Sequence, residues 1–309
     1  MRIGITGTGG FVGSRFMEYN KKRFSLFPII LRNIKPADLD LSGLDAIVHL
    51  AGKAHEMNTI DDQVYDDVNF GLTKELAVEA KKKGVQSFIY ISSVKVYGDK
   101  EDLFVDEDSL CHPTDAYGKS KLKAENFLKS IQDEQFKVAI IRPPLVYGPG
   151  VKGNMIRLLK LAEKNTLLPF GGVSNKRSMV FLDNLVELIN RAIETRAMGI
   201  FVAGDEKPVS TGELLSLIRG FMGKKAGIVT IPSPGRKLLR ILRPGLYKRL
   251  FGSFVIDHRK TDEMLGFTPP YSTEYGVKQM VNWYLTEQKG PNLNKAANET
   301  FRGGHSIQV

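Results

Sequence analysis

The sequence predicts an α/β fold, a doubly wound parallel sheet covered by helices on both faces, with a smaller second domain. Three observations predict this fold. Strand and helix patterns alternate through the first half of the chain. A glycine-rich turn at residues 6–13 joins the first predicted strand to the first predicted helix. Residues 45–51 form a nearly continuous apolar run, as expected for a strand that a parallel sheet buries on both faces.

Each element of the first half has its own local signal. The predicted helix 66–83 ends in three lysines and Gly84, which suit the negative end of a helix dipole and a left-handed cap. The predicted helix 115–135 has Thr114 or Asp115 as its candidate N-cap. The remaining elements are expected to be strands 1–5, 27–31, 45–51, 88–92 and 137–141, and a helix over 11–21.

The pattern changes after Pro144. A glycine-rich loop covers 147–154, and the later elements are predicted as helices 155–165, 184–195, 211–222 and 274–287 and strands 177–181 and 200–203. We predict that residues 1–150 and about 177–204 form the first domain. Residues 151–176 and 205–288 then form the smaller, partly discontinuous second domain. Residues 289–309 are polar and unpatterned, so this tail is predicted to be disordered.

The composition limits the class of protein. The chain has 309 residues, enough for a large core, and no apolar run long enough to cross a bilayer. The first residues lead straight into a strand, so no signal peptide is expected. The single cysteine, Cys111, excludes an internal disulfide and suits a reducing compartment, so a cytoplasmic protein is expected. The net charge of +10 fits nucleic acid, anionic lipid or a phosphorylated substrate, and does not by itself choose among them.

The glycines of the first turn indicate a bound phosphate group. A helix N-terminus offers unpaired N–H groups and a positive dipole end, so a pyrophosphate binds there when no Cβ blocks it. In the G-x-x-G-x-x-G spacing, Gly7 would make the tight turn, Gly10 would admit the phosphate and Gly13 would let helix pack on strand. The alternative is an ordinary glycine-rich turn between a strand and a helix.

Ser93, Tyr117 and Lys121 form a candidate catalytic group. Tyr117 and Lys121 are four residues apart and share one face of a predicted helix. Ser93 follows a predicted strand, at the edge where open α/β sheets bind ligands. A tyrosine acts as a general base only when its pKa falls well below about 10, and a neighbouring ammonium favours the phenolate. A Y-x-x-x-K pair also occurs on many solvated helix faces, but its place after the glycine turn and the serine favours catalysis.

Together these motifs make the chain resemble the extended short-chain dehydrogenase/reductases that act on nucleotide sugars. The resemblance covers nearly all of 1–287 and rests on TGTGGFVG at 6–13, HLAG at 49–52, VN at 68–69, SSVKVYG at 92–98, YGKSK at 117–121 and RPP at 142–144. RPPLVYGPGVKGN at 142–154 looks like a narrower subgroup, the UDP-glucose 4-epimerase-like proteins and the 4-reductases that make UDP-N-acetylquinovosamine for bacterial surface polysaccharides. The resemblance implies a Rossmann-type fold, an NAD or NADP cofactor, a UDP-sugar substrate, no nucleic acid partner and a homodimer.

The resemblance also implies a role for each matching residue. Ser93, Tyr117 and Lys121 would be catalytic. The cofactor-binding residues would be Gly7, Gly10, Phe11, Val12 and Gly13 at the pyrophosphate, Asp38 and Leu39 beside the adenine, and Leu50, Ala51, Gly52, Asn69, Tyr117, Lys121 and Pro143 along the rest of the cofactor. The substrate-binding residues would be Ser93, Asn154, Arg177 and Arg249. Asn69 is equally well explained as a capping or bridging amide, and Arg177 as a surface arginine.

At one position the chain departs from the pattern of the family it resembles, and this position concerns the cofactor and the reaction. Epimerases of the galactose type carry an aspartate after the second strand, where this chain has Arg32, and an arginine there favours the 2′-phosphate of NADP. A reductase consumes reduced cofactor, whereas an epimerase regenerates its own. Arg32 therefore favours a 4-reductase of a 4-keto-6-deoxy UDP-sugar. The alternatives are a UDP-glucose or UDP-N-acetylglucosamine 4-epimerase with retained NAD, and a non-catalytic dinucleotide-binding module. A 4,6-dehydratase is not expected, because Val94 and Lys95 stand where those enzymes carry an Asp-Glu pair.

Two further features have simpler interpretations. Residues 236–251 are basic and amphipathic, and we favour a second-domain helix with its apolar face in the core. Weak contact with an anionic membrane and a phosphate contact through Lys248 or Arg249 are the alternatives. His49 lies inside an apolar strand and is expected to be a satisfied core histidine, and no metal site is expected.

Overall fold

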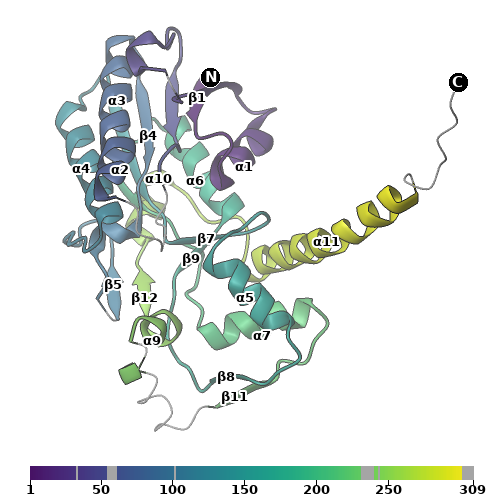
Figure 1. Cartoon of the computed structure of the whole chain (residues 1–309). Helices are drawn as coiled ribbons and strands as arrows, with labels where there is room; N and C mark the ends of the chain where they lie inside the picture. Colours follow the sequence, from purple (N-terminus) through teal and green to yellow (C-terminus); the bar gives the residue numbers. More distant parts are fainter. Residues whose placement is uncertain (33, 54–60, 101, 231–239, 243, 301–309) are drawn as a thin grey trace, which may run out of the picture.

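Six parallel strands form the main sheet of the computed structural model (Figure 1), which describes residues 1–32, 34–53, 61–100, 102–230, 240–242 and 244–300. Their spatial order is β10-β6-β4-β3-β1-β2, and every neighbouring pair is parallel. The strands are β1 (Arg2–Thr6), β2 (Ser25–Ile29), β3 (Ala46–His49), β4 (Ser87–Ile91), β6 (Lys137–Arg142) and β10 (Gly199–Val202). The predicted α/β class with a parallel, Rossmann-like sheet is confirmed.

The order of strands reverses at β1. The chain passes from β1 to β2 on one side and then crosses to β3 on the other side of β1. Ile5 of β1 therefore pairs with Pro28 of β2 and with Val48 of β3. Ligands bind at the carboxyl ends of the strands at such a point, because the two connections diverge and leave a crevice. Gly7 and Leu50 follow the two strands that border this crevice.

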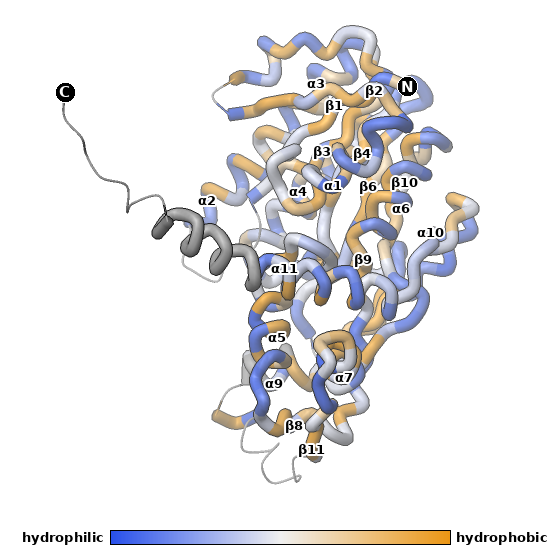
Figure 2. The backbone as a smooth tube through the Cα atoms, turned by 90° about the vertical axis from the view of Figure 1, so that its right-hand side faces the viewer, coloured by the Kyte–Doolittle hydropathy of each residue, from blue (hydrophilic) through white to orange (hydrophobic). Residues whose placement is uncertain are grey.

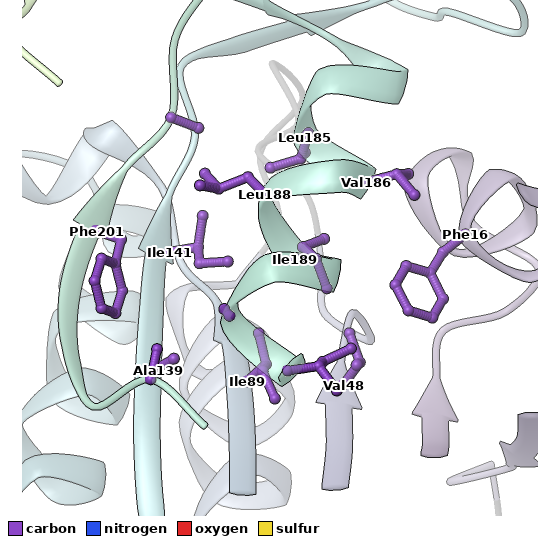
Figure 3. Close-up of a cluster of buried hydrophobic side chains, with 14 of the residues drawn as sticks. Phe16, Val48, Ile89, Ala139, Ile141, Leu185, Val186, Leu188, Ile189 and Phe201 are labelled. Carbon is purple, nitrogen blue, oxygen red and sulfur yellow. The ribbon is translucent and has the colours of Figure 1, made fainter. Parts of the chain in front are cut away.

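Helices cover both faces of the sheet (Figure 1). The helices α1 (Phe11–Asn20) and α6 (Leu182–Glu194) pack together on one face, and α3 (Leu72–Lys82) and α4 (Ala116–Ile131) pack together on the other. Figure 3 shows the first core, where Phe16 of α1 and Ile189 of α6 lie against Val48 and Ile89 of the sheet. Alternate residues of a strand point to opposite faces of the sheet. Because helices cover both faces, the residues on both faces must be apolar, which explains the continuous apolar runs.

A second buried cluster lies beyond the carboxyl ends of the sheet (Figure 1). Leu159, Leu215 and Val277 are fully buried there and come from three different helices. These helices are α5 (Asn154–Glu163), α7 (Thr211–Phe221) and α11 (Thr273–Thr300). Three two-stranded parallel pairs complete this part: β7 (Leu145–Tyr147) with β9 (Met179–Phe181), β8 (Leu168–Gly171) with β11 (Ile228–Thr230), and β5 (Leu103–Val105) with β12 (Phe254–Ile256). The division into two domains stays a prediction.

Three differences from the sequence-based expectation concern the site and the tail. The segment predicted as one helix over 66–83 is a π-helix, η2 (Asp66–Gly71), followed by α3, and the short helix α2 (Asp62–Tyr65) lies just before it. The second strand ends at Ile29, two residues before its predicted end, so Arg32 lies in a turn beyond it. The last helix continues to Thr300 and so includes 289–300, part of the tail predicted to be disordered. Residues 301–309 and most of the basic segment 236–243 lie outside the described residues.

Candidate active site

Close backbone contacts shape the glycine turn after β1. Gly7 has a φ of +69°, and a Cβ on it would lie 2.6 Å from the backbone nitrogen of Ala51. A Cβ on Gly13 would lie 2.1 Å from the carbonyl oxygen of Gly7, so α1 approaches the turn only because residue 13 has no side chain. Gly10 is the N-cap of α1 and donates to the Gly7 carbonyl (2.9 Å), and no side chain caps the helix. The first N–H groups of α1 are thus left for another acceptor, as a pyrophosphate requires.

A cleft of about 490 Å³ opens beside this turn. It is lined by Gly9, Gly10 and Phe11 of the turn, by Lys152 in the loop before α5, and by Trp283, which packs against the second cluster. The ring of Phe11 packs against the second core, whereas Val12 packs against the first. The first turn of α1 therefore lies between the two cores.

Thr6 fixes the end of β3 next to the glycine turn. Its hydroxyl oxygen accepts from the backbone N–H groups of Leu50 (3.1 Å) and Ala51 (3.0 Å), and lies 2.7 Å from Nδ1 of His49. Thr73 donates its hydrogen to a backbone carbonyl and therefore accepts from Nε2–H of His49 (2.9 Å). His49 is thus neutral with Nδ1 as acceptor, in agreement with burial, which lowers the pKa of His49 to about 3. The predicted satisfied core histidine is confirmed.

Asn69 joins three segments of the site from its place in η2. Its buried amide accepts from the Lys53 N–H (2.8 Å) and donates to the Lys53 carbonyl (3.2 Å) and to Oγ of Ser120 (3.1 Å). A Cβ on Gly52 would lie 2.9 Å from Oδ1 of Asn69 and 3.4 Å from Nζ of Lys121. Gly52 therefore leaves room for both side chains. A π-helix is a rare local widening of the backbone that is frequent at functional sites.

Ser93 and Tyr117 meet at the carboxyl end of β4. Ser93 is the N-cap of the short helix η3 (Val94–Tyr97), and its Oγ accepts from the Lys95 N–H (3.2 Å). The Val94 N–H donates to the carbonyl of Pro143 (3.1 Å), which ties this loop to the end of β6. Ser93 also shares a side-chain hydrogen bond with Tyr117, which opposes the rise in the tyrosine pKa.

The start of α4 places Tyr117 in the first helical turn. The carboxylate of Asp115 accepts from the Gly118 N–H (2.7 Å), so the predicted Asp115 cap is confirmed and Thr114 is not the cap. Burial raises the pKa of Tyr117 to about 12. The phenol of Tyr117 therefore keeps its proton at neutral pH and can donate it.

Lys121 lies one turn further along α4 and is nearly fully buried. Its ammonium donates to the carbonyl of Ile91 at the end of β4 (2.8 Å) and lies 4.7 Å from the centre of the Tyr90 ring. Burial lowers the pKa of Lys121 to about 8, and the negative charge of Glu125 acts in the opposite direction. Lys121 is therefore mostly cationic at neutral pH and loses its proton at slightly alkaline pH.

A buried ion pair that was not predicted from the sequence lies behind the site. Arg142, at the end of β6, donates to both carboxylate oxygens of Glu125 on α4 (3.1 and 2.5 Å). Ser92 donates to the same carboxylate (2.5 Å), and Arg142 also donates to the hydroxyl of Tyr97 (2.9 Å). The spacing of four residues between Lys121 and Glu125 is the signal that could have found it, since it puts both on one helix face.

The residues expected at the adenine end lie apart from the catalytic group. Arg32 is exposed in the turn after β2. Asp38 is exposed at the end of a short 3-10 helix, η1 (Pro36–Asp38), and Leu39 packs against the core on the α3 face. Their contacts with a cofactor stay predictions.

The residues expected to bind substrate come from the second half of the chain. Asn154 is exposed at the first position of α5. Arg177 donates to the Gly252 carbonyl (3.1 Å), directly after α9 (Pro244–Phe251), and burial lowers its pKa. Arg249 belongs to α9, and its side chain lies outside the described residues. Arg177 and α9 are thus neighbours, and the substrate contacts of all three residues stay predictions.

The described residues offer neither a metal site nor a membrane-spanning helix. No three of their His, Cys, Asp or Glu side chains are grouped so that they could hold a metal ion. None of their helices has the length and apolar character needed to cross a bilayer.

Comparison with known proteins identifies the family. Residues 3–204 match the model of the NAD dependent epimerase/dehydratase family. The chain belongs to this family. It is 34% identical over 311 residues to a UDP-glucose 4-epimerase of Vibrio cholerae, covering 91% of this chain and 94% of that protein. The identified family agrees with the predicted extended short-chain dehydrogenase/reductase, so the protein is an enzyme of this type that uses NAD or NADP.

Solved structures show the same fold. A UDP-glucuronic acid 4-epimerase from Bacillus cereus in complex with NAD has a TM-score of 0.74 at 22% identity, covering 92% of this chain and 96% of that one. RMD from Pseudomonas aeruginosa complexed with NADPH also has a TM-score of 0.74, at 20% identity, covering 93% of this chain and 98% of that one. One neighbour thus holds NAD and the other NADPH, so the likeness leaves the choice of cofactor open.

Proposed function

We propose that this enzyme performs NAD(P)-dependent oxidoreduction at C4 of a UDP-hexose, in the synthesis of a bacterial surface polysaccharide precursor. The observation that supports it most is the meeting of Ser93, Tyr117 and Lys121 at the carboxyl end of β4. The Vibrio cholerae relative, which is named a UDP-glucose 4-epimerase, supports the substrate class.

The carboxyl ends of β1 and β3 would hold a dinucleotide. Gly7 and Gly13 leave no Cβ in the turn, and the uncapped start of α1 offers N–H groups to a pyrophosphate. Phe11 and Val12 begin that helix, and Leu50, Ala51, Gly52 and Pro143 follow the neighbouring strands, where they would line the rest of the cofactor. When bound, the nicotinamide group supplies or accepts a hydride.

The chain itself supplies the proton chemistry. Tyr117 would exchange a proton with the oxygen on C4, while the Ser93 hydroxyl would hold that oxygen. In reduction, the high pKa of Tyr117 suits a phenol that donates its proton as the carbonyl oxygen becomes a hydroxyl. In oxidation, Tyr117 must accept a proton, and the Lys121 ammonium would favour the phenolate. Lys121 would also hold the nicotinamide ribose, with Asn69 and Gly52 shaping the space around its ammonium.

The direction of the reaction rests on two different observations. Arg32 is exposed beyond β2, where its guanidinium would pair with the 2′-phosphate of NADP, which favours a reductase of a 4-keto-6-deoxy sugar. The second candidate is a 4-epimerase with retained NAD, favoured by the Vibrio cholerae relative. In either case Arg177, Asn154 and Arg249 would contact the diphosphate of the UDP-sugar.

One experiment separates the candidate functions. The protein is incubated with a 4-keto-6-deoxy UDP-hexose and NADPH or NADH, and in parallel with UDP-glucose and UDP-N-acetylglucosamine without added cofactor. Stoichiometric oxidation of the added cofactor with a 6-deoxy product supports the reductase. Conversion of the UDP-sugars without added cofactor supports the epimerase instead. Tight dinucleotide binding with no turnover in any reaction would contradict the proposal and support a non-catalytic binding module.

A further inference from the structure

Nearly all the net positive charge of the chain belongs to one stretch. Residues 214–256 contain nine lysines and arginines and no aspartate or glutamate, so they contribute +9 to the net charge of +10. The rest of the chain is close to neutral. Such an asymmetry is typical of a surface that meets an anionic partner.

Part of this stretch lies toward one end of the molecule. Figures 1 and 2 view the chain from directions 90° apart, and in both α9, β8 and β11 lie in the lower part, away from α3 at the top. The strand β11 pairs with β8, so Leu167, which precedes β8, is also part of this end. We call the exposed residues of the helical turn 240–242, of α9 and of the β8–β11 pair the basic end.

Large apolar side chains are exposed on the basic end. Ile241 and Leu242 are 75% and 65% exposed, and Leu167 is 68% exposed. Leu250 and Phe251, in contrast, pack against the second core, where Phe251 stacks on Phe170 at 6.0 Å. The expectation that the apolar face of the whole segment lies in the core is therefore wrong for Ile241 and Leu242.

The basic end also carries exposed cations. Arg240 is exposed next to Ile241, with its guanidinium 5.6 Å from the centre of the Tyr247 ring, and Lys225 is exposed before β11. Lys248 is near Asp99. Burial raises the pKa of Asp99, but Lys95 and Lys248 together lower it below its usual value, so Asp99 balances part of the charge of Lys248.

We propose that the basic end binds the surface of an anionic phospholipid bilayer. Arginine and lysine side chains are attracted to anionic headgroups, while exposed aliphatic side chains enter the boundary with the acyl chains. A nucleic acid would use the charges but not Ile241 and Leu242, so the pairing of both features favours a membrane. Because Gly252, directly after α9, accepts from Arg177, this docking would bring Arg177, a predicted substrate-binding residue, close to the bilayer. The proposal does not depend on the reaction that the enzyme performs.

Flotation with lipid vesicles tests the proposal on the full chain. Wild type should float with vesicles of phosphatidylcholine and phosphatidylglycerol and not with phosphatidylcholine alone, and high salt should weaken the binding. The double variant Ile241→Asp with Leu242→Asp should weaken partitioning by at least about tenfold, because it removes the side chains that would enter the acyl boundary. The single variant Arg240→Glu should also weaken it by at least about tenfold, because it reverses a charge near the headgroups.

Matched controls come from elsewhere on the surface. Met264→Asp changes an exposed apolar residue of α10 (Arg259–Leu265), and Lys21→Glu reverses an exposed charge after α1. Both should float like wild type. Absence of wild-type flotation, equal binding to neutral vesicles, or equal losses in test and control variants would each overturn the proposal. The proposal would also be overturned if Arg240→Glu weakened binding while the Ile241 and Leu242 substitutions left it unchanged, because such binding would depend on charge alone.

Discussion

The guanidinium of Arg142 and the carboxylate of Glu125 form a two-point ion pair that is almost completely buried, at 1% and 0% exposure. Tyr117, Lys121 and Glu125 follow one another at intervals of four residues along α4. The ion pair therefore joins the helix face that carries the predicted catalytic residues to the end of β6. An uncompensated buried charge is costly, so this pair holds α4 against the sheet.

Removing one partner of the ion pair should destabilise the fold. Glu125→Gln leaves the Arg142 cation buried without its counter-charge, and we expect a loss of about 3–5 kcal/mol in the free energy of unfolding. Urea denaturation measures this value. Glu75→Gln on α3, where residue 75 is exposed, should change it by less than about 0.5 kcal/mol. Equal effects of the two substitutions would contradict the role given to the pair.

The pH dependence of reduction should follow Lys121. The pKa of Lys121 lies at about 8, below its usual value, so its ammonium is present at neutral pH and is lost as the pH rises through 8. We expect kcat/KM for reduction to fall above about pH 8, measured by initial rates at several pH values. Lys121→Arg keeps its charge throughout this range and should not show this fall. The same fall in both proteins would assign it to another group.

Replacing the tyrosine hydroxyl should stop the chemistry and not the binding of cofactor. Tyr117→Phe keeps the ring and removes the exchangeable proton, so we expect kcat to fall by about 10²–10⁴-fold or more with an unchanged dinucleotide Kd. Tyr19→Phe, at the far end of α1 from the glycine turn, provides the control: it loses only a hydroxyl that lies 3.1 Å from that of Tyr271 and should retain wild-type turnover. Full activity of Tyr117→Phe would refute the proposed acid–base role.

Two glycines of the same turn offer a steric test. A Cβ on Gly13 would meet the Gly7 carbonyl oxygen at 2.1 Å, whereas a Cβ on Gly9 would meet nothing within 4 Å. Gly13→Ala should push α1 away from the turn, weaken dinucleotide binding by at least about tenfold and cost about 1–3 kcal/mol of stability. Calorimetric titration and thermal unfolding measure the two effects. Gly9→Ala should keep wild-type stability, and an equal loss of stability in that variant would show that the turn is arranged differently.

The choice of cofactor should depend on Arg32. Arg32→Ala removes a guanidinium that would pair with the 2′-phosphate, so the Kd for NADPH should rise about tenfold or more while that for NADH stays constant. Fluorescence titration with each reduced cofactor measures both constants. If NADPH affinity survives the substitution, Arg32 does not read the 2′-phosphate, and the argument for a reductase loses its basis.

Local signals in the sequence were sufficient for much of the fold. Apolar runs in strands such as β3 and β4 predict burial on both faces, and Asp115 predicts the start of α4, because these properties depend on neighbouring residues alone. Parallel strands put their carboxyl ends at one edge of the sheet. The sequence could therefore also place the glycine turn and the three candidate catalytic residues, Ser93, Tyr117 and Lys121, at that edge. Their roles in catalysis and binding stay predictions.

The sequence by itself thus determined the order along the chain of the six strands of the main sheet, the glycine turn and the identity of the candidate catalytic residues. Only the tertiary structure decided which long-range partners they have. The pairing of Glu125 with Arg142, the π-helix that positions Asn69 and the exposure of Ile241 and Leu242 depend on segments far apart in the chain. Periodicity reports which face of an element is apolar, but whether a given side chain is covered, or a charge neutralised, depends on what packs against it.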